Sequence, residues 1–560
     1  MKFLKRSAVL LDFLFLAGLF WIVRYWHCLH FGLYEDDLTI IPDAFTRTFS
    51  SLISFLFTYI THLSGHARPL SNSFIYFFSW TGWRLAGLWG PYLIGYLITV
   101  INLGLFFWLM RRVASRPFAL LAGLGYILYS ADTTQAFLTH SLGLQPSITL
   151  ILLALHCYLS NKRALAYVLV FAVLFSYELP FFLFAAAPLF KKTWNRAMWK
   201  ELLWHCVILA AMAGGIYAFR ILIGEKRVGG IGLKELILTP PLHMLEGPLV
   251  NLGMFLYRPY QALRAANFET GLAILLAVAF FTWLISRLPV TTQVKAGDLW
   301  RALRDPAARA RLPEEVKSLG RIAAVGLTML VLAYPLTFTV RAYAISGRDT
   351  RVHAAGVAGA ALLAASVALS LIYLTNGSIW RRLVNLLIAL ELALLVGYGF
   401  VIQRDYVLAW QYQRQFWTEL LPLIQDADSK TYVLVTSDGL KDTQQIDANT
   451  WNLPNILGQL YDFPSSSVPR VFRLRSGWQD HLDKSASIFI SGVTSYVAPD
   501  FYEKADFPNI ILIDTRSGKM VRHTGTLDVD GIAYSIKKTS EPVLSALGHD
   551  LLYDLMIVRP

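Results

Sequence analysis

Three adjacent carboxylates, Glu35, Asp36 and Asp37, follow directly after the first apolar segment of the chain, residues 8–30. Charged groups beside lipid are costly, and proteins keep them where they pair, line a watery cavity or take part in chemistry. A carboxylate at such a boundary can serve as a general base, because desolvation or a like-charged neighbour raises its pKa toward the working pH. The alternative is a solvated loop or an interfacial anchor, so the surrounding elements matter.

The composition places the chain in the membrane class. Of its 560 residues, 55% are hydrophobic and only 16% are charged, against about 25% charged in soluble domains. Apolar stretches near the roughly 20 residues that cross a bilayer recur up to residue 402, and we expect about eleven spans, give or take one. They lie at residues 8–30, 89–110, 117–131, 145–160, 164–177, 179–190, 201–222, 268–287, 321–340, 354–375 and 382–402.

Lysine and arginine give the orientation, since short cytoplasmic loops accumulate these residues. Lys2, Lys5 and Arg6 place the N-terminus in the cytoplasm, and with eleven spans the other basic loops fall on the same face. We expect a bacterial inner membrane protein whose acidic cluster and C-terminal domain are periplasmic. The net charge of +13 reflects the inner loops facing anionic lipid headgroups, so it gives no reason to expect nucleic acid.

The composition changes at residue 405 from apolar to polar. Short apolar runs follow, each bounded by Asp, Gly, Ser or Pro, which is the pattern of strands separated by turns. We therefore expect a membrane domain at 1–404 and a small mixed α/β domain at 405–560. The runs occupy residues 431–435, 468–472, 486–490, 510–513 and 532–536, and a helical pattern covers 450–460.

The loop after the first span holds more than the acids. Residues 40–60 carry apolar side chains at helical spacing, which suits an amphipathic helix lying in the membrane interface. Asp43 is then an interfacial polar residue. His62 and His66 stand four residues apart, a spacing that can hold a metal ion, although no third ligand is identified.

The order of these features resembles that of membrane glycosyltransferases of the GT-C fold, the class that includes protein O-mannosyltransferases. Acids outside the first span, a long external loop with a helix, an Arg-Pro-Leu sequence at 68–70 and a Gly-Pro-Tyr-Leu-Ile-Gly-Tyr sequence at 90–96 carry the resemblance. Residues 131–137 and 176–180 agree with it, although Gln135 stands where relatives often carry an acid and Tyr177 where they carry lysine. The resemblance is strongest before residue 190.

The resemblance implies transfer of a sugar from a polyprenyl phosphate carrier to an acceptor, a protein, lipid or glycan, on the outer face of the membrane. Such a reaction needs a base that takes the acceptor's proton and cations that stabilise the departing phosphate. Asp36 and Asp37 are the candidate bases. Glu35, Asp37 and His66 are possible ligands of a divalent cation, Mg²⁺ or Mn²⁺. The alternative for Glu35 is that it is simply solvated.

External arginines are the candidates for binding the donor phosphate, because the planar guanidinium matches phosphate oxygens. Arg68 follows the loop helix, and Arg341, Arg348 and Arg351 cluster between the ninth and tenth expected spans, against the positive-inside trend. The alternative for this cluster is salt bridging with Asp349 or with outer-leaflet headgroups.

Glu178 lies between two short apolar segments and either binds substrate or pairs as a buried structural group. The external connection 224–267 is expected to act as a lid or an acceptor platform. Broken segments near Glu178 would also fit the alternative function, a lipid or glycolipid transporter or flippase. Against that class, the two halves of the chain show no similarity, and the charges cluster on one external face.

Overall fold

The structure is a computed structural model in which helices make up 70% of the described residues, and the strands among these residues are confined to a small C-terminal region. This agrees with the expectation of a helical membrane protein with a C-terminal region of strands. The structure describes residues 2–61, 67–225, 232–290, 292–338, 341–375, 377–443, 445–446, 453–463, 468–474, 482–483, 487–489, 504–529 and 531–557.

The chain divides into two compact units, each of which is described by itself. The first unit comprises Met1–Leu29 and Phe49–Arg404, and the second comprises His30–Thr48 and Asp405–Pro560. The short segment that carries the acidic cluster therefore groups with the C-terminal part of the chain, whereas the sequence analysis placed it in the membrane domain.

Each expected span overlaps a helix, and seven segments of the described chain are long and apolar enough to cross a membrane. Helices α6, α9, η2 and α16 do not meet that standard, so the number of spans stays a prediction. The helices in question are α1 (Lys2–Tyr25), α5 (Trp89–Val113), α6 (Arg116–Ile127), α8 (Gln145–Leu159), α9 (Arg163–Phe175), η2 (Phe181–Phe190), α10 (Arg196–Leu222), α13 (Phe268–Ser286), α16 (Glu314–Val331), α17 (Val357–Leu374) and α18 (Ser378–Leu420).

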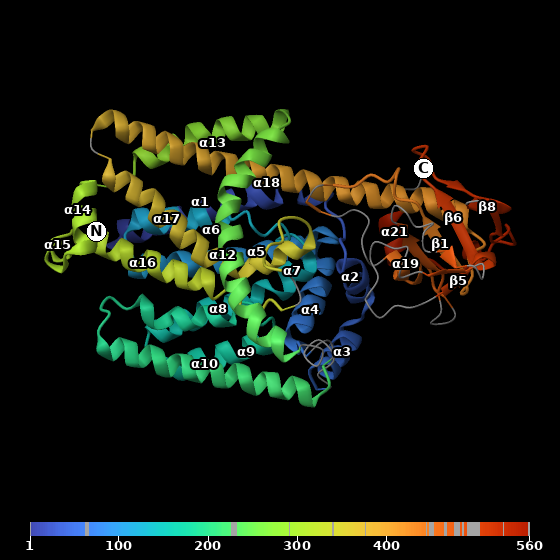
Figure 1. Ribbon diagram of the computed structural model, residues 1–560, viewed down its shortest axis with the longest axis horizontal. Coiled ribbons are helices and arrows are strands. Elements are labelled where there is room, and N and C mark those ends of the chain that lie inside the picture. The colour runs from blue at the N-terminus through green and yellow to red at the C-terminus, as the bar shows by residue number, and fades with distance from the viewer. Residues whose placement is uncertain are drawn as a thin grey trace. The chain divides into compact units, whose positions relative to one another are not determined.

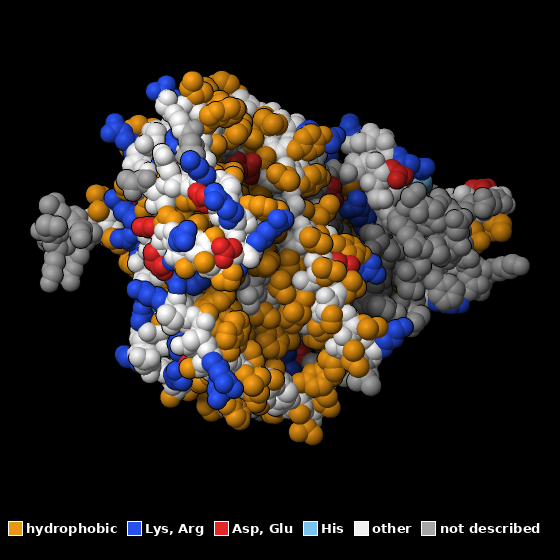
Figure 2. Space-filling view, turned by 60° about the vertical axis from the view of Figure 1, so that its left-hand side comes forward, with side chains coloured by type: hydrophobic (Ala, Val, Ile, Leu, Met, Phe, Trp, Pro, Cys, Tyr) orange, Lys and Arg blue, Asp and Glu red, His pale blue; other side chains and the backbone are white. Residues whose placement is uncertain are grey.

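The surface of the first unit fits a lipid environment. Large apolar side chains such as Leu203 and Trp204 on α10, and Leu275 and Trp283 on α13, are more than half exposed. Figure 2 shows that hydrophobic side chains cover much of the visible face. An apolar surface of this extent is normally covered by lipid or by protein. The start of α1 lies toward the same end of the helices as α14 (Ala296–Arg304) and α15 (Pro306–Ala310), as Figure 1 shows and as the positive-inside pattern predicts.

The expected single amphipathic helix at 40–60 is wrong, because the structure has two helices there. Helix α2 (Asp37–Thr46) ends at Arg47, whose backbone is extended, and α3 (Phe49–Thr61) begins two residues later. Further helices of the first unit are α4 (Pro69–Ala86), α7 (Leu138–Gly143) and η3 (Arg348–Gly356).

Most of the connection at 224–267 forms one long helix, α12 (Leu233–Arg264), which runs across the direction of α10 and α16 (Figure 1). Its four prolines each remove a backbone donor and disfavour regular helix geometry. Three polar side chains of this helix, His243, Asn251 and Arg258, are buried. Polar groups buried in this way are normally hydrogen-bonded, so α12 is expected to organise the loops it crosses.

The second unit contains a four-stranded sheet in the order β2-β1-β6-β7. Strand β1 (Tyr432–Val435) pairs in parallel with β2 (Arg470–Arg473) and with β6 (Ile510–Asp514), and β7 (Val521–Arg522) runs antiparallel to β6. A three-stranded antiparallel sheet and a hairpin complete the strands. They are β3 (Leu482–Asp483), β4 (Ser487–Phe489) and β5 (Lys504–Asp506), and the pair β8 (Thr526–Val529) and β9 (Ile532–Ser535).

All five predicted strands are confirmed, as β1, β2, β4, β6 and β9, and the predicted helix is α19 (Leu453–Leu460). On one face of the sheet, Leu434 and Leu512 pack with Phe472 in the buried cluster, and on the other face Val433 and Ile511 are also fully buried. Burial on both faces is typical of parallel strands and explains their continuous apolar runs.

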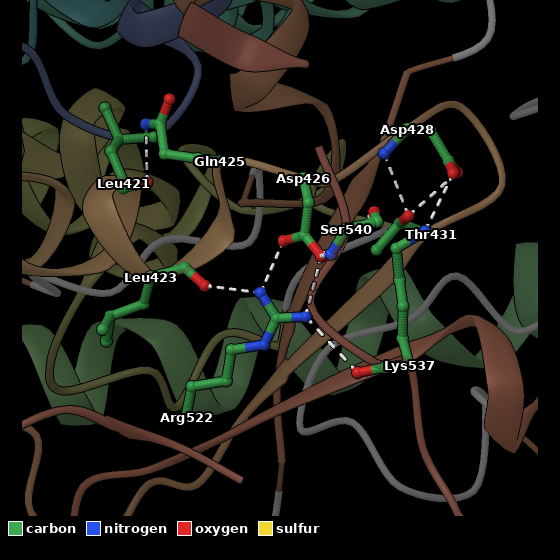
Figure 3. A network of polar contacts seen from close by, with 9 residues as sticks. All are labelled: Leu421, Leu423, Gln425, Asp426, Asp428, Thr431, Arg522, Lys537 and Ser540. Atoms are coloured by element: carbon green, nitrogen blue, oxygen red, sulfur yellow. Dashed lines mark hydrogen bonds and ion pairs between the residues drawn. The ribbon is translucent and has the colours of Figure 1, made fainter. Parts of the chain in front are cut away.

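A buried polar network connects the segment that follows α18, residues 421–428, to the sheet of this unit (Figure 3). The guanidinium of Arg522 on β7 donates to both carboxylate oxygens of Asp426, and further to the carbonyl oxygens of Leu423 at 3.0 Å and Lys537 at 3.3 Å. The side chains of Arg522 and Asp426 are only 9% and 3% exposed. Asp426 follows η4 (Leu421–Ile424), so the network ties the end of the long helical segment to strand β7.

Candidate functional site

The acidic cluster lies in the second unit, at the start of α2. Asp37 is the first residue of this helix and is fully buried, and Glu35 is nearly so. Asp36 is the partly exposed member. Glu35 has a φ of +50°, a left-handed conformation that is rare outside glycine and tends to occur at functional sites.

The segment before the acids is fixed to α18 within the second unit. Tyr34 donates its hydroxyl to the carbonyl oxygen of Tyr406 at 2.7 Å, and its oxygen accepts from the backbone N–H of Gly32 at 2.9 Å. A Cβ at Gly32 would lie 1.8 Å from the ring of Trp410, so only glycine permits this approach. The backbone that leads to Asp36 is thereby held in one place.

Accessibility separates the two candidate bases. A general base must come within hydrogen-bond reach of the proton it takes, directly or through one water. Asp36 is partly exposed, whereas Asp37 is fully buried. The metal hypothesis for Glu35, Asp37 and His66 stays a prediction, because His66 lies outside the described residues, and within those no three His, Cys, Asp or Glu side chains gather as ligands.

Arg68 and Glu178, both candidates for substrate binding, form an ion pair with each other in the first unit. Arg68 donates through Nε to Oε2 of Glu178 at 2.9 Å and through a second nitrogen to Oε1, and its guanidinium lies 4.3 Å from the ring centroid of Tyr177. Arg220 approaches Glu178 at 3.5 Å and Glu225 at 3.5 Å. Of the two alternatives left open for Glu178, the geometry matches a structural ion pair, which is partly buried.

The charges around Glu178 also determine its protonation. Burial alone would raise its pKa, but the neighbouring Arg68 and Arg220 outweigh burial and lower the pKa to about 2. Glu178 is therefore a carboxylate at any physiological pH, and it is unsuited to giving or taking a proton.

The three arginines of the second predicted cluster differ in their surroundings. Arg341 is exposed and donates to the hydroxyl of Tyr343, and Arg348 opens η3 and is partly exposed. Arg351, on the same helix, is also partly exposed, and it makes no hydrogen bond or ion pair with any part of the chain that the structure describes. None of the five donors of its guanidinium is taken up by a described residue.

A buried carboxyl group lies within electrostatic reach of Arg351. Asp132, in the connection between α6 and α7, is 2% exposed, and its Oδ1 accepts from the backbone N–H and the hydroxyl of Thr134 at 2.8 and 2.7 Å. Burial raises the pKa of Asp132, although Thr134 and the charges of Arg24 and Arg351 act in the opposite direction. A carboxyl with a raised pKa near a cation is a candidate for proton transfer.

His140 completes this group. It lies on α7, is 93% buried, and is within electrostatic reach of Arg348 and Arg351. Its Nδ1 has no hydrogen-bond partner among the described residues, which is unusual for a buried ring nitrogen. We call Asp132, His140, Arg348 and Arg351 the Arg351 cluster.

Two distant loops meet at the Arg351 cluster. The hydroxyl of Thr350 accepts from the backbone N–H of Thr133 at 3.1 Å and lies 2.9 Å from its hydroxyl. Arg258 of α12, fully buried, donates to the carbonyl oxygens of Ser130 at 3.2 Å and Ile345 at 2.8 Å. A single side chain thus joins the α6–α7 connection to the segment before η3.

A second set of contacts from α12 supports the same loops. Asn251 donates to the hydroxyls of Tyr129 and Tyr334, the latter at 3.0 Å. The Tyr334 hydroxyl in turn lies 2.8 Å from Nδ1 of His353, whose Nε2 lies 2.8 Å from the carbonyl oxygen of Ala344. His353 is therefore a fully buried side chain that links Tyr334 to the backbone before η3.

In the sequence, Asp132 was recognised only as part of the stretch 131–137, and neither His140 nor Asn251 was predicted as a site residue. The available signal was the presence of polar side chains within or beside apolar segments, which are costly unless they pair or function. Arg258 lies within the 224–267 connection, and its contacts with two loops could not be inferred from its position in the sequence.

Comparison with known proteins adds no relative: no family model matches this chain, and no curated protein matches it at a significant level. Any function must therefore be argued from the residues and their geometry.

Proposed function

We propose that the protein is a membrane glycosyltransferase that moves a sugar from a polyprenyl phosphate carrier to an acceptor on the external face of the membrane. The observation that carries the proposal is the Arg351 cluster. Two connections far apart in the sequence are held together so that Arg351, without an ion-pair partner in the described chain, lies near a buried carboxyl group.

Phosphate chemistry suits these arginines. When the bond between the sugar and its carrier phosphate breaks, the phosphate takes the electron pair and gains negative charge. Arg351, with Arg348 beside it on η3, would stabilise that charge through bidentate, charge-assisted hydrogen bonds. Arg68 contributes less in this scheme, because its fork is already engaged by Glu178.

The acceptor side of the reaction needs a base. The acceptor hydroxyl gives its proton to a carboxylate while its oxygen attacks the anomeric carbon of the sugar. Asp36 is our first candidate, because it is the partly exposed member of the cluster that follows α1. Asp132 is the second, because its raised pKa brings it closer to neutral pH.

The architecture of the first unit supports a lipid-linked donor. Its long apolar helices and the exposed apolar faces of α10 and α13 are suited to the bilayer in which a polyprenyl chain resides. α12, which crosses these helices, supports the loops of the Arg351 cluster through Asn251 and Arg258 and is proposed as part of the wall of the donor site.

Mass spectrometry of glycolipids and envelope glycoproteins tests the proposal. Cells that lack the gene should lose at least one glycan mass that wild-type protein restores and Arg351→Met does not. Arg301→Met, at an exposed arginine of α14, is the matched control and should restore it. Identical glycan profiles with and without the gene would exclude the proposal.

A further inference from the structure

The topology of the second unit creates a crevice at one edge of its sheet. From β1 the chain crosses by way of α19 to β2 on one side, and β6 later adds on the other side of β1. Strand order therefore reverses beside β1. In open α/β sheets, ligands bind outside the carboxyl ends of the strands at such a switch point.

A cavity of about 70 Å³ lies at this edge. It is lined by the turn after β1, by the turn after β6 and by one side of α18, all within the second unit. A single water needs about 10–15 Å³, so the cavity has room for a larger chemical group.

The two turns that form its rim are fixed to each other. The hydroxyls of Thr436 and Thr515 lie 3.0 Å apart, and the backbone N–H of Gly439 donates to the Thr515 hydroxyl at 3.1 Å. A Cβ at Gly439 would lie 1.7 Å from the carbonyl oxygen of Thr515, so glycine is required for this approach. The cavity is therefore preformed, which reduces the entropic cost of binding.

The chemistry of the lining combines aromatic, hydrogen-bonding and cationic groups. Tyr412 and Phe416, one turn apart on α18, give it an aromatic side. Gln415 donates to Glu419 at 2.7 Å, which places an amide and a carboxylate beside the rings. Two lysines, Lys441 and Lys519, face the same cavity, the first with its ammonium 5.8 Å from the Tyr412 ring centroid.

This combination fits one class of ligand. The apolar C–H face of a sugar ring packs on an aromatic ring, sugar hydroxyls pair with amide and carboxylate groups, and the lysines attract a negative charge. We infer that the cavity at the β1–β6 edge binds an acidic sugar, a hexose that carries a carboxylate or a phosphate. Free sugar and the same residue within a glycan share this chemistry.

The inference does not depend on the proposed transferase reaction, since binding is measured without turnover. Calorimetry on the full-length protein in nanodiscs should use glucuronic acid and glucose 6-phosphate as probes, with glucose and inorganic phosphate as comparison ligands. The acidic sugars should bind saturably and at least about tenfold more tightly than either comparison ligand, a difference of about 1.4 kcal/mol, because each comparison ligand lacks either the charge or the sugar ring.

Variants locate the binding. The double substitution Lys441→Gln and Lys519→Gln should weaken binding of both acidic sugars about tenfold or more, whereas Lys538→Gln, at an exposed lysine of the same unit, should not change it. Both lysines are exposed, so the fold tolerates the change. The inference is overturned by a lack of saturable binding, by inorganic phosphate binding as tightly as glucose 6-phosphate, or by unchanged affinity in the double variant.

Discussion

Replacement of Arg522 by alanine should open the second unit locally. In the structure, this guanidinium pairs with the carboxylate of Asp426 and donates hydrogen bonds to the carbonyl oxygens of Leu423 and Lys537 (Figure 3). Asp426 would keep the backbone N–H of Ser540 at 3.1 Å and the Ser540 hydroxyl at 3.5 Å as neutral donors. A carboxylate that is 3% exposed would then lack its counter-charge.

The size of the effect follows from the burial of the pair. Removal of one partner of a buried ion pair costs about 3–5 kcal/mol, because the other charge stays buried. At about 1.4 kcal/mol per factor of ten, the amides protected by this network should exchange their hydrogens about 100- to 3,000-fold faster. Native-state exchange reports such local opening even where the whole chain does not unfold in two states.

The assay is hydrogen–deuterium exchange with mass spectrometry on the full-length protein, read on peptides that cover β6 and β7. The control is Arg516→Ala, which removes an equally close but exposed pair with Asp514, and its exchange should stay within about fivefold of wild type. If Arg522→Ala also stays within about threefold, the buried network does not stabilise this unit.

The same network predicts an acid dependence. Burial would raise the pKa of Asp426, but the hydrogen bonds from Arg522 and Ser540 outweigh burial and lower it below its ordinary value of 3.8. The stabilising contribution is therefore complete above about pH 4 and is lost as the pH falls through the lower, folded-state pKa. In the wild type, protection of the β7 amides from exchange should decline in that pH window. In Asp426→Asn this pH-dependent decline should not occur.

Three further predictions concern the first unit. Glu178→Gln should destabilise it by about 1–3 kcal/mol, because the pair is only partly buried, and the pair's contribution should fade between about pH 4.5 and pH 2, since the folded-state pKa is about 2; thermal unfolding checks this, and full stability of Glu178→Gln would contradict it. Arg351→Lys should weaken donor binding about tenfold or more, because a point charge cannot replace the fork, whereas Arg301→Lys should leave it unchanged; a polyprenyl phosphate binding assay decides. A periplasmic reporter fused at residue 480 should be active, and activity of a cytoplasmic reporter there would reverse the topology.

Five strands of the second unit were predictable because each apolar run is short and ends in turn-forming residues, as at β1 and β6, whereas β3, β5, β7 and β8 were not predicted. The apolar helices of the first unit were predictable from the length of their apolar stretches, whereas the long helix α12, which contains four prolines, was not. The number of helices that cross the membrane is harder to predict, since η2 has only ten residues and the apolar length of a segment does not reveal its tilt or depth.

The site was predictable only in part. The acids after α1 could be recognised from the sequence because they are adjacent to each other and directly follow an apolar stretch. Arg68 and Glu178 are separated by 110 residues, so the local sequence could not reveal that they form an ion pair. Thr133 and Thr350 are separated by 217 residues, so their contact, which joins two loops, could not be predicted either. The interruption between α2 and α3 was missed because helical periodicity continues through Arg47 although the backbone does not.

Sugar transfer by the purified, full-length protein tests the central claim most directly. The protein in nanodiscs would receive polyprenyl phosphate carrying tritiated mannose, glucose, galactose or arabinose, with cell-envelope extract as the source of acceptor. We predict transfer from at least one donor, and a loss of about 100- to 10,000-fold in rate, with donor binding intact, in Asp36→Asn. No transfer from any donor, or near-normal rates in Asp36→Asn, Asp37→Asn and Asp132→Asn alike, would contradict the account.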